Sequence, residues 1–184
     1  MQAVVIYESM FGNTRAIAYA ISTGLAEYFD VAVIPVGQAY PTSYSQADLV
    51  VVGGPTHMHG MSRPSTRQGA AKQAAVGNSG LTLEPGAQGE GLREWLASHI
   101  TSRGHGLAAA FDTRMQGPAV FTGRASKGIS GALRRQGYEL IAKPESFLVT
   151  KANDLRPGEQ DRARAWGAAL AESLSLTAES SSST

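Results

Sequence analysis

The sequence predicts an α/β protein whose parallel sheet is doubly wound, with helices on both faces in a three-layer sandwich. Short segments that are apolar throughout are typical of strands covered on both faces. Five such segments occur, at residues 3–7, 31–36, 49–52, 107–111 and 147–149. Patterns with a helical period separate them. Strands that alternate with helices along a chain imply right-handed crossovers within one parallel sheet.

The helices are predicted from apolar residues that share one helical face. A short second helix or an irregular crossover is expected within 38–47, where Pro41 excludes a long helix. Two later helices end near 103 and 134–137, where basic residues are followed by glycine, as helix C-termini favour. The apolar faces are formed by Ile17, Ile21 and Leu25; by Leu92, Trp95, Leu96 and Ile100; by Ala125, Ile129, Ala132 and Leu133; and by Ala163, Trp166, Leu170 and Leu174.

The chain of 184 residues is long enough for one domain with a substantial core. We assign residues 1–174 to that domain and expect the serine-rich segment 175–184 to be disordered. Residues 61–88 form a connection far longer than the roughly 12–15 residues at which loops become uncommon. A short helix could form around 66–75, and 138–141 is expected to lead into the last strand.

The composition excludes several classes of protein. Without cysteine, the chain has no disulfide, thiolate metal site or cysteine nucleophile. A formal net charge of +1 gives no argument for nucleic-acid binding. No apolar run approaches the roughly 20 residues of a membrane helix, and no leader peptide is evident. We therefore expect a soluble, cytoplasmic protein with no nucleic-acid or membrane partner.

The segment between the first strand and the first helix is rich in hydroxyl groups and glycine. Residues 9–14 read Ser-Met-Phe-Gly-Asn-Thr. Such a turn can direct several N–H groups and two hydroxyls at one point, which is the geometry that holds a phosphate at a helix N-terminus. A simple helix N-cap is the alternative. Because parallel sheets bind ligands outside the carboxyl ends of their strands, the segments after the first, third and fourth strands define the expected site.

Two motifs resemble those of the flavodoxin-like family. The first consists of Val5, Ile6, Tyr7, Ser9, Gly12, Thr14, Ala18 and Ile21, which match the flavodoxin signature. The second lies at residues 53–60, where Gly-Gly-Pro-Thr resembles the Gly-x-Pro-Thr loop beside the isoalloxazine ring. The order of strands and helices agrees over about residues 2–174. The resemblance implies a flavodoxin-like fold with a five-stranded parallel sheet in the order 2-1-3-4-5, and flavin mononucleotide (FMN) as the cofactor.

The resemblance also implies which residues bind FMN. The phosphate would lie against Ser9, Met10, Phe11, Gly12, Asn13 and Thr14. The ring and its polar edge would lie along Pro55, Thr56, His57, Met58 and His59, with Asp112, Thr113 and Arg114 as the other wall. The ring-stacking aromatic residues common in flavodoxins are not evident. The first loop has no lysine or arginine, so N–H dipoles and hydroxyls would hold the phosphate.

The charge balance bears on the kind of redox protein. Flavodoxins of the carrier type are strongly acidic, whereas this chain is nearly neutral. Arg114, with Arg63 or Arg67 from the long connection, would favour the negative charge of a reduced flavin. The hypothesis is an FMN-dependent oxidoreductase that uses a small-molecule electron acceptor and is fed by NAD(P)H or by a redox partner. The alternatives are a one-electron shuttle for a partner reductase and a flavin-free binding module.

Two further features leave their roles open. The cations of the long connection, including Lys72, could bind nicotinamide dinucleotide phosphates, build a homodimer contact or lie in a solvated loop. His57 and His59 alone are too weak a signal for a metal site, so we predict none. We nominate no catalytic side chain, because the flavin itself would carry the chemistry.

Overall fold

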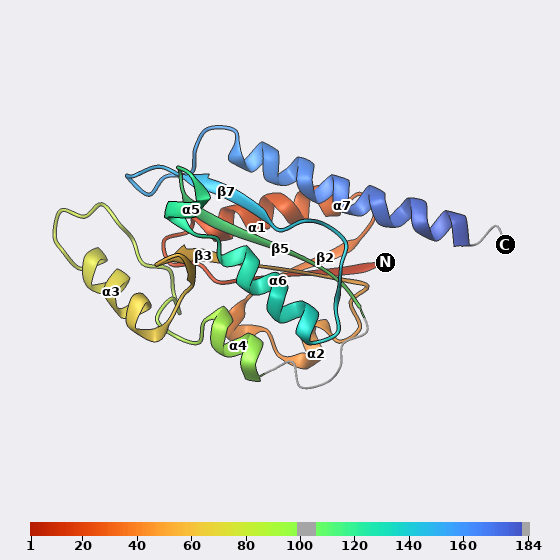
Figure 1. The fold of residues 1–184 in the computed structure, drawn as a ribbon, viewed down its shortest axis with the longest axis horizontal. Coiled ribbons are helices and arrows are strands. Elements are labelled where there is room, and N and C mark those ends of the chain that lie inside the picture. The colour runs from red at the N-terminus through yellow and green to blue at the C-terminus, as the bar shows by residue number, and fades with distance from the viewer. Residues whose placement is uncertain (99–105, 182–184) are drawn as a thin grey trace.

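A sheet of mainly parallel strands lies between two layers of helices in the computed structural model, which describes residues 1–98 and 106–181 (Figure 1). Its strands follow the order β2-β1-β3-β5, and β6 and β7 both pair with β5 beyond. They are β1 (Gln2–Tyr7), β2 (Asp30–Pro35), β3 (Leu49–His57), β4 (Gly60–Met61), β5 (Leu107–Met115), β6 (Glu139–Leu140) and β7 (Glu145–Val149).

This order confirms the predicted 2-1-3-4-5 arrangement, with two differences of detail. The fifth position is divided: β6 pairs with the start of β5 and β7 with its end. A short antiparallel strand, β4, forms a hairpin with the end of β3. In addition, β3 and β5 continue beyond their apolar segments, so Pro55–His57 and Asp112–Arg114 lie within strands rather than in the following loops.

The helices divide between the two faces of the sheet. Figure 1 shows α1 and α7 on one face and α2, α4 and α6 on the other, with α3 and α5 near the edge where β3 ends. They are α1 (Asn13–Leu25), α2 (Pro41–Tyr44), α3 (Pro64–Ala74), α4 (Leu92–Ser98), α5 (Ala119–Thr122), α6 (Ala125–Arg135) and α7 (Glu159–Ser181), with a 3-10 turn, η1, at Val36–Gln38.

Most predicted helices are present with similar bounds. The crossover within 38–47 contains α2, and the long connection contains α3. The predicted helix beginning at Leu92 is α4, but Ile100 and its predicted end near 103 lie outside the described residues. The last helix differs from expectation, because α7 continues through 175–181 of the segment expected to be disordered. No described helix has the length and apolar character needed to cross a membrane.

Alternate residues of β1 supply the two halves of the hydrophobic core. Val5 and Tyr7 pack in the cluster that includes α1 and α7, whereas Val4 and Ile6 pack in the cluster that includes α4 and α6. Neighbouring side chains of a strand point to opposite faces of the sheet. In a strand with helices on both faces, the side chains on each face must therefore be apolar. This explains why the strand segments are uniformly apolar in the sequence.

Helices α1 and α7 approach each other closely at two glycines. A Cβ atom at Gly24 would lie 2.0 Å from the Arg164 carbonyl oxygen, and one at Gly167 would lie 2.3 Å from the Ile21 carbonyl oxygen. Both neighbours are backbone atoms, which cannot rotate away. The contact therefore requires glycine on each helix.

We predict that Gly24→Ala destabilises the fold. Overpacking of this kind costs about 1 to 3 kcal/mol and outweighs the roughly 1 kcal/mol that alanine gains in helix propensity. Gly69→Ala in α3 is the matched control, because a Cβ there meets no atom within 4 Å; it should stabilise by up to about 1 kcal/mol. Urea unfolding of the two variants measures both effects, and equal midpoints would contradict the prediction.

Candidate functional site

Three segments that are remote in sequence meet at the carboxyl edge of the sheet and enclose a pocket of about 180 Å³. They are the loop after β1, the end of β3 and the end of β5, with the connection after β7 as a fourth contributor. The lining residues are Ser9, Met10, Phe11, Asn13, Thr14, Pro55, Thr56, His57, Thr113, Arg114, Met115, Val149 and Asn153. Ten of the fourteen site residues expected from the sequence are among them; Gly12, Met58, His59 and Asp112 are not.

The loop after β1 presents unused N–H groups at the start of α1. Gly12 has φ 92°, a left-handed conformation that glycine adopts at little cost, and its N–H donates to Ser9 Oγ at 3.1 Å. Within the described residues, the N–H groups of Phe11, Asn13 and Thr14 donate to no protein acceptor. Unpaired donors at the N-terminus of a helix attract anions, because the helix dipole adds to their partial charges.

Two hydrogen bonds fix this loop to other parts of the chain. The hydroxyls of Thr14 and Thr113 lie 2.7 Å apart and are both buried, which joins the loop to β5. Asn13 Nδ2 donates to the carbonyl oxygen of Asn153 at 2.6 Å, which joins it to the connection after β7. The unpaired N–H groups are therefore held by tertiary contacts as well as by the local turn.

The end of β3 supplies the second side of the pocket. Pro55, Thr56 and His57 line it, whereas the following Met58 and His59 are exposed and adopt positive φ angles of 45° and 74°. His59 bridges to Gly123 just after α5, so the two segments touch. Burial, and to a lesser extent the nearby Arg67 guanidinium, lower the pKa of His57. The imidazole is therefore neutral at pH 7.

Two of the expected site residues cap helix α6 instead of presenting free groups. Thr56 Oγ1 accepts from the Ala125 N–H at 2.9 Å, and Asp112 Oδ2 accepts from the Ser126 N–H at 2.8 Å. Asp112 is fully buried, and that burial raises its pKa, although the Ser126 N–H opposes the shift. Asp112 therefore holds the start of α6 against β5 and does not line the pocket.

Arg114 is the cation that lines the pocket, and it also holds the neighbouring loop. Its Nη1 donates to the Gly117 carbonyl oxygen and to Thr122 Oγ1, both at 2.8 Å. Arg67 was expected to offer its charge to a reduced flavin, but it is 3 % exposed and pairs with Glu94 at 2.9 Å. Arg63 and Lys72 are exposed on the long connection.

The segment that Arg114 holds contains residues that the sequence did not identify. Phe121 and Val120 in α5 are 74 % and 79 % exposed, and Met115 is 48 % exposed. The Thr122 contact and the His59–Gly123 bridge keep α5 beside the pocket. The large apolar side chains between Gly117 and Gly123 could have indicated a binding loop from the sequence. This segment was not identified because it belongs to neither of the two flavodoxin-like motifs. Asn153 and Val149 were missed because no pattern in the sequence marks them.

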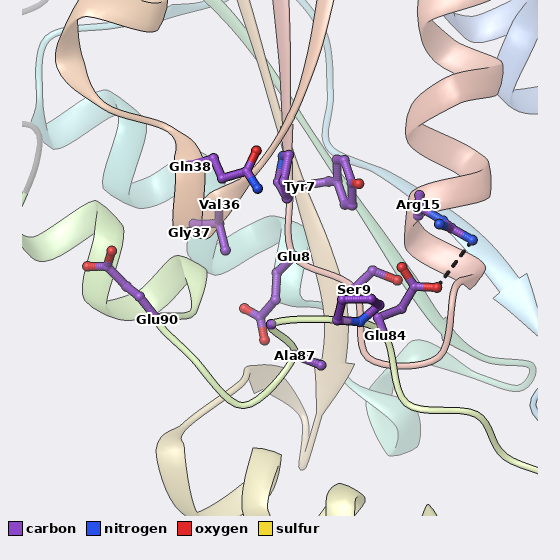
Figure 2. Close-up of a pocket in the computed structure, with 13 residues that line it drawn as sticks. Tyr7, Glu8, Ser9, Arg15, Val36, Gly37, Gln38, Glu84, Ala87 and Glu90 are labelled. Carbon is purple, nitrogen blue, oxygen red and sulfur yellow. Dashed lines mark ion pairs between the residues drawn. The ribbon is translucent and has the colours of Figure 1, made fainter.

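The long connection folds back over the first loop. Met10 packs with Ala70 and Ala87, and the Glu84 N–H donates to the Met10 carbonyl oxygen at 2.8 Å. A second cavity, of about 330 Å³, lies on the far side of the loop (Figure 2). It is larger than the first pocket, but only the first pocket gathers the ends of β1, β3 and β5, and we take that pocket as the candidate site.

Comparisons with known proteins agree with this architecture. A flavodoxin from the domain Archaea matches with a TM-score of 0.62 and 21% identity over 94% of this chain and 97% of that one. The two-electron reduced flavodoxin of Megasphaera elsdenii matches at 0.59 and 15% identity, over 93% and 99%. Rubredoxin oxygen:oxidoreductase of Desulfovibrio gigas matches at 0.63 and 16% identity, over 95% of this chain but 36% of that one.

No protein-family model and no curated protein matches the sequence. The structural matches nevertheless cover almost the whole chain. The chain therefore has the flavodoxin-like fold, as the two motifs indicated.

The buried carboxyl at the cap of α6 gives a prediction about pH. Asp112→Asn keeps an oxygen that can accept the Ser126 N–H but removes the charge. Because burial raises the pKa of Asp112 in the folded chain, the wild type loses stability as pH rises from the unfolded to the folded pKa. The variant lacks this loss, so its advantage should grow with pH. Urea unfolding between about pH 4 and about pH 8 measures the difference, and parallel curves would contradict it.

Proposed function

We propose that this chain binds FMN at the pocket between β1, β3 and β5 and functions in electron transfer through the flavin. The observation that carries the proposal is the set of unpaired N–H groups at Phe11, Asn13 and Thr14, which meet the other two strand ends at one pocket. This is a cradle suited to a phosphate monoester.

The residues of the first loop fit the phosphate. Its charge would be met by N–H groups, by the dipole of α1 and by the Ser9 hydroxyl. Thr14 and Thr113 share one hydrogen bond, which leaves one of their two hydroxyl protons for a ligand. The nearest cation in the helix, Arg15, pairs with Glu84 at 3.2 Å.

The ring would extend beyond the enclosed pocket. Ligand pockets usually measure about 300 to 1,000 Å³, so a volume of about 180 Å³ holds only part of a flavin. Met115 lines this pocket, Met58 directly follows the lining residue His57, and Phe121 lies in α5, which is tied to Arg114 and His59 through Thr122 and Gly123. These exposed side chains would cover apolar ring surface. Two aromatic residues could stack on the ring: Phe11 in the lining and the exposed Phe121 in α5.

The charges beside the pocket favour a two-electron oxidoreductase over a one-electron shuttle. Arg114 is among the lining residues, which include no Asp or Glu. A cation in this position stabilises the negative charge of a fully reduced flavin. We propose NAD(P)H or a partner protein as the electron source and a small molecule as the acceptor.

We predict that the purified protein is yellow or becomes so with FMN, and that it binds FMN at least about tenfold more tightly than riboflavin. Hydrogen bonds to a charged group contribute about 1.5 to 3 kcal/mol each, and riboflavin lacks the phosphate that accepts them. Phe121→Ala should weaken both ligands alike, whereas Tyr19→Ala, at an exposed aromatic on α1, should weaken neither. Fluorescence titration measures these affinities, and equal binding of the two flavins would refute the phosphate cradle.

Removing the pocket's cation should change the redox behaviour of the bound flavin. Arg114→Leu should make the two-electron reduction potential more negative, because the charge of the reduced flavin loses its partner. Arg114→Lys is the matched control that keeps the charge. Photoreduction against a reference dye measures the potential. Two well-separated one-electron steps in the wild type would support the shuttle instead.

A further inference from the structure

The charges of this chain are unevenly distributed, although their sum is close to zero. No aspartate or glutamate occurs between Asp48 and Glu84, or between Asp112 and Glu139. These two stretches nevertheless carry half of the lysines and arginines, which are Arg63, Arg67, Lys72, Arg114, Arg124, Lys127, Arg134 and Arg135. The small net charge therefore conceals two cationic stretches, which the carboxylates elsewhere in the chain balance.

The two stretches meet beside the candidate pocket. His59 bridges to Gly123, and a Cβ at Gly123 would lie 2.1 Å from the His59 Cα. A Cβ at Gly128 would lie 3.2 Å from Met61 Cε, so the start of α6 packs against β4. Figure 1 shows this edge of the molecule, where α3 and α5 lie near the end of β3. The cations that lie next to these contacts in the sequence are Arg63, Arg124 and Lys127.

These three cations are not neutralised by carboxylates. Arg63 and Lys127 are exposed, and Arg124 is half-buried. None of the three forms an ion pair within the described residues. Arg67 differs from them, because it is buried and paired with Glu94. The edge therefore presents uncompensated positive charge to the solvent.

Exposed apolar side chains occupy the same edge. Met58, Val120 and Phe121 are the three most exposed large apolar side chains of the described residues. Met58 directly precedes His59, and α5 directly precedes Gly123, so the bridge between those two residues brings the apolar segments together. Apolar side chains gathered on a surface mark interaction sites, and protein interfaces typically have an apolar centre and a polar rim.

We propose that this edge docks an acidic electron-transfer protein, which delivers electrons to the flavin. The docking surface consists of Met58, Val120 and Phe121 at its centre and Arg63, Arg124 and Lys127 at its rim. Carboxylates of the partner would face the three cations, which speeds the encounter and fixes the orientation of the complex. This inference rests on the proposed flavin site. Two reduced partner molecules would each lose one electron, and the flavin would gain both electrons and one proton from water.

The position of the docking surface favours a redox protein over other anionic partners. Met58 follows the lining residue His57, and α5 is tied to the lining residue Arg114 through Thr122, so the surface adjoins the pocket. A redox partner needs this proximity to the flavin, whereas an anionic membrane does not. The three rim cations do not line the pocket, so a small ligand held there would leave them unused.

The experiment uses an acidic plant-type [2Fe–2S] ferredoxin as the probe and cytochrome c as a basic comparison. Lys127→Glu reverses one rim charge, and a carboxylate in the first turn of α6 suits the helix dipole. Arg135→Glu is the matched control, because it makes the same change of net charge about 12 Å farther along α6. Val120→Ser removes an apolar contact without changing the charge. Calorimetry measures ferredoxin affinity at about 0.02 M and about 0.3 M salt, with and without FMN.

We expect ferredoxin to bind the wild type at the lower salt concentration and about tenfold or more weakly at the higher one. Lys127→Glu should weaken binding by about fivefold or more, whereas Arg135→Glu should change it by less than about twofold. Val120→Ser should weaken it by about threefold at both salt concentrations. Reduced ferredoxin should reduce bound FMN more slowly in the variants that bind it more weakly.

The proposal is overturned if ferredoxin does not bind the wild type, if salt does not affect the binding, or if Lys127→Glu and Arg135→Glu weaken it equally. Tighter binding of cytochrome c or of phosphatidylserine vesicles than of ferredoxin also overturns it. A protein that binds ferredoxin in this way but binds no FMN would support the docking surface and refute the proposed function.

Discussion

The parallel register of β1, β3 and β5 is the constraint on which the rest of the site depends. Tyr7 is paired with Gly53, and Gly54 with Asp112, so the three strands reach one edge together. A slip of one residue would exchange the two faces of a strand and expose its core residues. The same pairing that buries the core therefore brings Thr14 within 2.7 Å of Thr113.

Two glycines in β3 make this close approach possible. A Cβ at Gly53 would lie 2.2 Å from the Phe111 ring, and one at Gly54 would lie 2.6 Å from Leu92 Cδ1. Any side chain at these positions would push the ring of Phe111 or helix α4 away from the sheet. The glycines of the Gly-Gly-Pro-Thr motif therefore serve packing, while the residues after them shape the pocket.

Several polar residues near the edge are committed to the protein itself. Thr56 and Asp112 pair with the first N–H groups of α6, and Arg67 pairs with Glu94 and Ser62. Such buried groups would be costly without partners. The N–H groups of Phe11, Asn13 and Thr14 differ because no protein acceptor in the described chain satisfies them, which is why they are the better indication of a ligand.

The sequence by itself determined the five main strand positions of the sheet, their order through the flavodoxin resemblance, and the glycine-containing turn at residues 9–14 that is proposed to bind an anion. These features are local: an apolar run, a helical period, and a glycine that permits a left-handed turn are all readable within a few residues. It also identified most of the residues that line the first pocket, because they follow or end neighbouring parallel strands.

Only the tertiary structure decided which polar side chains face a cavity. Asp112 and Glu8 are both buried carboxyls at strand ends, yet Asp112 caps α6, whereas Glu8 accepts from the Leu92 N–H and lines the second cavity. Their roles depend on α6 and on the segment 84–92, which are distant in sequence. The segment that carries Phe121 is held near the site for the same reason, because Thr122 contacts Arg114 and Gly123 bridges to His59 across the fold. Contacts between remote segments leave no periodic signal in the chain, so they could not be read from it.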